Sequence, residues 1–133
     1  MKWLLDTNAC IRYLNGRSAN LRQRVDAANP ADLVVCSVVK AELFFGAAKS
    51  IDPARTLQKQ KYFLSRFASL PFDDAAAAHY GPVRARLEQA GTPIGPNDLL
   101  IAAIALGGGV TLVTRNTAEF ARIPGLPIED WEA

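Results

Sequence analysis

The strongest constraint on the fold is a run of eight apolar residues, Leu99 to Leu106, which directly follows Asp98. A helix built from this run is apolar on every face, and such a helix belongs in a protein interior. The run is also far shorter than the ~18 apolar residues that a membrane span needs. We therefore expect the chain to fold around this helix, with Asp98 at the edge of the core.

Length and composition predict one soluble globular domain that covers residues 1–133. Half of the residues are hydrophobic, 21% are charged, and the formal net charge of +2 does not by itself indicate a nucleic-acid partner. Near the start of the chain only three consecutive apolar residues, Trp3 to Leu5, precede the charged Asp6. This apolar stretch is too short for a signal peptide. Cys10 and Cys36 are expected to be small buried side chains in a reducing compartment, so we expect a cytoplasmic protein.

Short apolar runs alternate with helical patterns along the chain. Such an alternation predicts an α/β sandwich around a mostly parallel sheet. We predict strands at residues 2–5, 32–36, 70–73, 110–114 and 126–131, and helices at residues 8–16, 18–29, 38–49, 52–70, 74–91 (bent or broken near Gly81-Pro82), 98–106 and 116–123.

Four acidic residues follow or lie near the predicted strand ends. Asp6 ends the first strand, Glu42 lies early in the helix after the second strand, and Asp98 begins the apolar helix. Glu119 and the neutral Asn116 follow the strand at 110–114. In α/β sheets, ligands bind beyond the carboxyl ends of the strands. We therefore expect these side chains to face one crevice.

Structural roles offer an alternative for most of these residues. Asp6 could be a helix N-cap, and Asp98 could favour its helix through the dipole. Asn116 and Glu119 have the spacing of a capping box. No cap explains Glu42, which lies among aromatic and branched residues.

A group of carboxylates needs a cation. Carboxylates at close range repel and take up protons, and an unpaired buried one costs several kcal/mol. No lysine or arginine is obviously assigned to this group, whereas Mg²⁺ prefers oxygen ligands and leaves room for a phosphate. The pattern therefore predicts a divalent-metal site.

Basic residues gather in two other segments. Arg17, Arg22 and Arg24 lie close together, and Lys59, Lys61 and Arg66 follow in the middle of the chain. They could bind phosphates, or they could form solvated helix faces.

Four motifs in order resemble those of the PIN-domain ribonucleases and, more narrowly, of the VapC toxins of bacterial toxin–antitoxin pairs. They are "LLDTNACI", "SVVKAELFFGA", "GPNDLLIAA" and "LVTRNTAEFARIPGLPIEDW", and together they extend from Met1 nearly to Trp131. The resemblance implies a PIN-like sandwich with five parallel strands between helices. It also implies an endoribonuclease that depends on Mg²⁺ or Mn²⁺.

The resemblance also implies roles for individual residues. Asp6, Glu42 and Asp98 match the core acids of the family, and Asp6 and Asp98 are the expected metal ligands. Asn116 stands where the fourth acid usually follows "TR", which puts a second metal in doubt. Glu119 matches an acid of one branch, and it or Glu42 would position or deprotonate the attacking water. The supporting residues at the same rim, for which turn or cap roles are equally open, are Thr7, Asn8, Ser37 and Thr114.

Members of the family dimerise, are silenced by a VapB-type antitoxin and attack structured RNA, commonly tRNA. The stretches "GTPIGPND" and "PGLPIEDW" resemble the members that cut initiator tRNA in the anticodon loop. Two alternatives stay open. One is a PIN-like module that has lost catalysis and binds RNA or protein, and the other is a small-molecule phosphohydrolase that uses the same acids.

Overall fold

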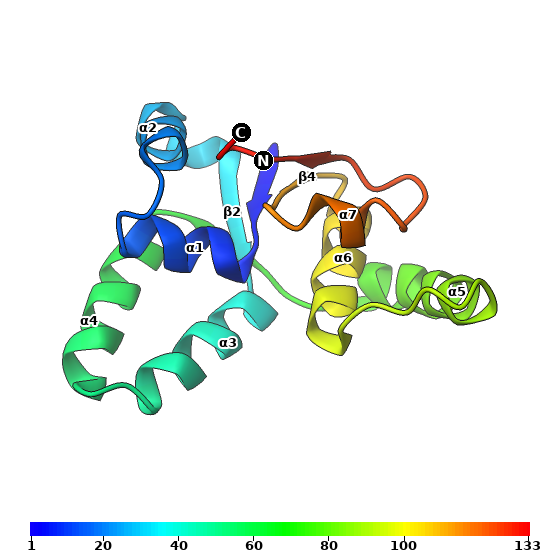
Figure 1. Ribbon diagram of the computed structural model, residues 1–133, viewed down its shortest axis with the longest axis horizontal. Coiled ribbons are helices and arrows are strands. Elements are labelled where there is room, and N and C mark those ends of the chain that lie inside the picture. Colours follow the sequence, from blue (N-terminus) through cyan, green and yellow to red (C-terminus); the bar gives the residue numbers. More distant parts are fainter.

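The computed structural model describes residues 1–133. Five strands alternate with seven α-helices and one 3₁₀ turn (Figure 1). In chain order the elements are β1 (Trp3–Leu5), α1 (Thr7–Leu14), α2 (Ala19–Ala27), η1 (Pro30–Asp32), β2 (Leu33–Cys36), α3 (Ser37–Ala48), α4 (Pro53–Leu64), β3 (Ala68–Leu70), α5 (Asp74–Gln89), α6 (Pro96–Gly108), β4 (Thr111–Val113), α7 (Thr117–Phe120) and β5 (Ile128–Glu129).

The five strands form one sheet in the order β3-β2-β1-β4-β5, and every neighbouring pair is parallel. From the central β1 the chain adds β2 and β3 on one side and later β4 and β5 on the other. The order therefore reverses between β1 and β4, where ligands bind in open α/β sheets. The predicted five-stranded parallel α/β architecture is confirmed.

Helices α1 to α4 lie on one side of β1 and β2 in Figure 1, and α5 to α7 lie on the other. The apolar helix α6 is buried along Leu99 and residues 101–105, as its composition predicts. It ends at Gly109, whose φ of 63° is the left-handed conformation that favours glycine. A Cβ at Gly107 would lie 3.0 Å from the backbone nitrogen of Ala76, so glycine lets α5 and α6 approach closely.

Two predicted boundaries are wrong. The helix predicted for residues 52–70 ends at Leu64, because the Arg66 and Phe67 amides bond the carbonyls of Phe63 and Leu64 in a turn. Strand β3 then pairs with β2 at Ala68–Leu70 and not at residues 70–73. Its side chains are mostly exposed at the sheet edge, so the hydrophobic pattern there is weak.

The predicted break near Gly81-Pro82 is also absent. Helix α5 is continuous from Asp74 to Gln89 and contains Pro82. A proline inside a helix removes one hydrogen bond. Because Pro82 is exposed and Ala76 and Leu87 are buried on the opposite side, packing on that side holds the helix together.

The two marked chain ends lie side by side (Figure 1). The Trp3 and Trp131 rings meet edge to face with centroids 5.4 Å apart. Both indole N–H groups donate to the Glu129 carboxylate at 3.1 Å. These contacts hold β5 at the sheet edge next to β4. None of the helices has the length and hydropathy that crossing a membrane would take.

Candidate active site and metal centre

Asp6 stands at the end of β1 and also begins α1. Its Oδ1 accepts a hydrogen bond from the Ala9 amide at 2.7 Å, so the N-cap role is real. Only 5% of the residue is exposed, and burial raises its pKa to about 6 against the opposing effect of a Thr114 hydrogen bond. Thr114 itself is buried at the end of β4. Asp6 therefore lies at the switch point between β1 and β4.

Glu42 projects from α3 toward the first turn of α1. Its Oε1 accepts a hydrogen bond from the Thr7 hydroxyl at 2.5 Å, and its Oε2 accepts one from Asn97 at 3.4 Å. A cavity of about 710 Å³ surrounds this group, and Asn8 and Ser37 line it as well. Helices α1, α3 and α6 thus each contribute a polar side chain to one crevice.

Asp98 is the third residue of α6 and lies half-buried in its first turn. Burial, followed by the charges of Glu119, Glu42 and Asp6 in that order, raises its pKa to about 6. Asp98 therefore lies near enough to the other three acids selected from the sequence for their charges to repel its own.

The capping box predicted as an alternative for Asn116 and Glu119 does not form, because Asn116 makes no side-chain cap on α7. Its amide instead donates to Glu119 Oε2 at 2.8 Å, and the backbone N–H of Gly95 donates to Glu119 Oε1 at 3.0 Å. These two hydrogen bonds lower the pKa of Glu119. Glu119 therefore connects α7 to the loop that leads into Asp98.

Two polar residues near the acids were not predicted. Asn97 immediately precedes Asp98, and this adjacency is a signal that could have revealed it. Glu132 raises the pKa of Asp6 through its charge and is itself paired with Arg12 at 2.6 Å. Nothing in the local sequence around Glu132 indicates that it lies near the end of β1.

Asp6 and Asp98 are the residues best suited to hold a divalent ion. Neither takes part in any of the five ion pairs of the chain. No three histidine, cysteine or acidic side chains converge in a metal-ligating group. Because Mg²⁺ usually takes one or two carboxylates and several waters, the donor set fits such an ion.

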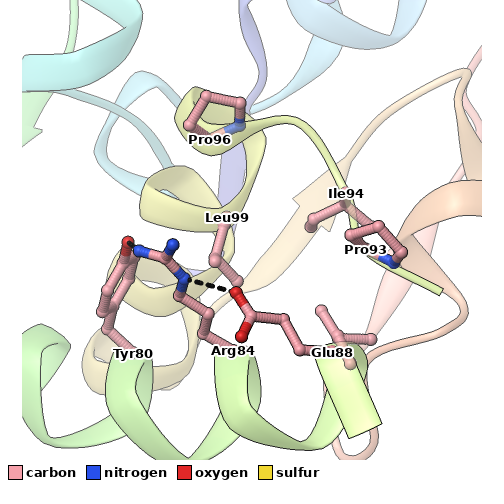
Figure 2. Close-up of a pocket in the computed structure, with 8 residues that line it drawn as sticks. Tyr80, Arg84, Glu88, Pro93, Ile94, Pro96 and Leu99 are labelled. Carbon is pink, nitrogen blue, oxygen red and sulfur yellow. Dashed lines mark hydrogen bonds and ion pairs between the residues drawn. The ribbon is translucent and has the colours of Figure 1, made fainter. Parts of the chain in front are cut away.

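A second pocket lies between α5 and the loop before α6, with a volume of about 270 Å³ (Figure 2). The Arg84 guanidinium donates to the Glu88 carboxylate and to the Tyr80 hydroxyl, both at 3.0 Å. The charges in this pocket are therefore paired within it. The unpaired carboxylates near β1 and β4 make the better candidate for chemistry.

A parallel sheet with acids at its switch point defines an α/β domain whose ligand site lies at the carboxyl ends of the strands. The model of the PIN domain family matches residues 3–126, so the chain belongs to the PIN domain family and, within it, to the VapC proteins. One relative is the tRNA(fMet)-specific endonuclease VapC of Salmonella typhimurium, 42% identical over 98% of both chains. Another is Ribonuclease VapC2 of Rickettsia felis, 38% identical over 99% of both.

Solved structures agree with this assignment. The chain matches the crystal structure of DNA-bound VapBC from Salmonella typhimurium with a TM-score of 0.93 and 42% identity over 98% of both chains. VapBC2 from Rickettsia felis, bound to a DNA fragment from its promoter, gives a TM-score of 0.92 and 37% identity, over 98% of this chain and 99% of that one. The resemblance inferred from the four motifs is confirmed.

Proposed function

We propose that the protein is the toxin of a VapBC-type toxin–antitoxin pair and acts as an endoribonuclease that depends on Mg²⁺ or Mn²⁺. The observation that carries this proposal is the pair Asp6 and Asp98, two carboxyl groups with no cationic partner at the switch point of a PIN domain. Carboxylates held together in this way favour a bound cation, because otherwise each takes up a proton.

Asp6 and Asp98 would hold the ion, and both sit on rigid supports. Asp6 is fixed by the Ala9 amide, and Asp98 by the buried helix α6. When bound, the ion supplies a Lewis acid for a phosphate oxygen and lowers the pKa of water. Glu42 would orient or deprotonate the attacking water, because Thr7 and Asn97 hold its two oxygens in place.

We further propose that the substrate is a structured RNA, with tRNA, and initiator tRNA above all, the first candidate. Two relatives at 42% and 43% identity are named tRNA(fMet)-specific endonuclease VapC. A VapB-type antitoxin is the proposed partner, since the matched structures are VapBC complexes. We expect the toxin to form a homodimer and to act in the cytoplasm, where tRNA is found.

The test is cleavage of total tRNA by the purified protein, freed of antitoxin, in Mg²⁺ or Mn²⁺. Discrete fragments with 5′-phosphate and 3′-hydroxyl ends are expected, and chelation by EDTA should abolish them. Addition of the antitoxin should also abolish them. A folded protein that binds RNA but never cuts it would favour the non-catalytic alternative, for which Asn116 in place of a fourth acid is the structural argument.

A further inference from the structure

Three adjoining cavities extend from Glu42 along α1, α3 and α4. The cavity around Glu42 adjoins a second one of about 320 Å³, and the two share Ile11, Glu42 and Gly46. This second cavity adjoins a third one of about 490 Å³ and shares Leu14 and Lys59 with it. We refer to these three joined cavities as the lysine trough.

Most of the charges that line the lysine trough are positive. Glu42 is the only acid that lines it, and Lys49 lines the same cavity as Glu42. Lys59 lines the second and third cavities, and Arg66 lines the third. The two lysines are exposed and form no ion pair, whereas Arg66 lies 3.7 Å from the Asp26 carboxylate. Lys49, which directly follows α3, and Lys59 of α4 are thus free to bind anions.

Exposed aromatic rings accompany these cations. Lys49 Nζ lies 4.7 Å from the centroid of the Phe45 ring, and Phe45 is 65% exposed. At the far end Tyr62 is 81% exposed. Cations beside exposed aromatic rings are the features that bind single-stranded nucleic acid, since lysines contact phosphates and rings stack on bases.

One arginine from each basic segment of the sequence lies at this far end. Arg22 of α2 lies over the Tyr13 ring at 5.1 Å, and Arg66 at the end of α4 lies 6.0 Å from the same ring. Tyr13 lines the trough beside Tyr62. Cations far apart in the sequence therefore gather around one aromatic surface.

We propose that the lysine trough binds the single-stranded RNA next to the cleaved bond, with Lys49 and Lys59 on flanking phosphates and Tyr62 stacked on a base. This rests on the proposed function, because it takes RNA as the substrate. Glu42, which the proposed function assigns to the attacking water, marks the part of the trough next to the reacting phosphate. The two lysines suit flanking phosphates that are held but not cleaved.

The test measures binding of a fluorescein-labelled single-stranded RNA by anisotropy in EDTA, so that nothing is cut. The variants are Lys49→Gln and Lys59→Gln, with Lys61→Gln as the matched control, because Lys61 is exposed on α4 but does not line the trough. Binding to single strands weakens with salt at a slope of about −0.7 per phosphate contact. Each trough variant should reduce the slope by about 0.7, and Lys61→Gln should leave it unchanged.

Tyr62 provides an independent readout. Tyr62→Ala should weaken binding about tenfold with no change in salt slope, because stacking releases no counterions. Tyr62→Phe keeps the ring and should restore the affinity. Equal RNA affinities and equal salt slopes in wild type, Lys49→Gln and Lys59→Gln would overturn the proposal. The trough would then be a candidate binding site for a protein partner. Because no cleavage is measured, failure of the nuclease proposal would not be mistaken for failure of the trough.

Discussion

The Thr7 hydroxyl donates a 2.5 Å hydrogen bond to Glu42 Oε1 and joins the start of α1 to α3. Thr7 directly follows Asp6, so this one contact fixes the position of Glu42 relative to the acid at the end of β1. Asn97, next to Asp98, makes the corresponding contact with the other Glu42 oxygen. Glu42 is therefore oriented by the immediate neighbours of both proposed metal ligands.

Thr7→Val should lower the RNA cleavage rate about 10- to 100-fold, the usual effect of removing a residue that orients a metal-site group. Valine keeps the side-chain shape but donates no hydrogen bond to Glu42. Thr7→Ser keeps the donor and should retain most of the activity. The comparison is made with initial rates at saturating Mg²⁺. A Thr7→Val enzyme with full activity would show that Glu42 needs no such support.

Asp6→Asn should abolish cleavage and yet stabilise the metal-free protein. Asparagine is as good an N-cap as aspartate, so the hydrogen bond from Ala9 survives. The buried charge is removed, which we expect to raise the free energy of unfolding at pH 7.5 by about 2 kcal/mol. Urea unfolding in EDTA measures this difference. A large loss of stability would mean that the Asp6 charge holds the fold together.

The pH dependence follows from the raised pKa values of Asp6 and Asp98, both about 6. Between pH 4 and 6 the folded protein binds more protons than the unfolded chain, whose aspartates have a pKa near 3.9. Stability in EDTA should therefore fall as the pH rises through this interval, the reverse of the usual behaviour of paired carboxylates. Chemical unfolding at a series of pH values measures this change in stability. Saturating Mn²⁺ should remove the loss of stability at pH 7.

Activity should show the opposite trend. Both carboxylates must be ionised to hold a metal, so at a Mg²⁺ concentration well below the Kd cleavage at pH 5 should be about 100-fold slower than at pH 7. A rate that depends on only one ionisation, about tenfold across the same range, would exclude one of the two residues as a ligand.

Glu119→Ala tests whether Glu119 supports the site or takes part in the reaction. Its two oxygens accept hydrogen bonds from Gly95 and Asn116, so its loss should free the loop before α6. Hydrogen exchange at the Gly95 amide should accelerate, and the cleavage rate should fall about tenfold. If the rate falls as far as in Asp98→Asn while the loop stays protected, Glu119 acts on the water or the metal directly.

The positions of the acids were predictable because strand ends and helix starts follow from local patterns. Asp6, Glu42 and Asp98 each lie at such a position, and the parallel order of the sheet brings them together. The supporting contacts were not predictable. The bond between Gly95 and Glu119 joins residues 24 positions apart, and packing alone decides it. Asp6 shows a further limit of sequence analysis. The N-cap was an alternative to a role in the site, whereas the structure has Asp6 cap α1 and lie at the site as well.

The errors in the predicted strands and helices also arise where tertiary packing, and not the local pattern, decides the structure. Strand β3 lies at the sheet edge with mostly exposed side chains, so its pairing with β2 left little trace in the hydrophobic pattern. The lysine trough also could not be predicted, because Lys49 follows α3 and Lys59 lies on α4, and only the packing of these helices brings the cavities together.

Direct measurement of Mn²⁺ binding is the most decisive test of whether these carboxylates form a metal site. Electron paramagnetic resonance of free Mn²⁺ would follow titrations of wild type, Asp6→Asn and Asp98→Asn, with Asp74→Asn as an exposed control at the start of α5. We predict one site that disappears in Asp6→Asn and Asp98→Asn and persists in Asp74→Asn. Equal binding by all four proteins would contradict the assignment of Asp6 and Asp98 as the metal ligands.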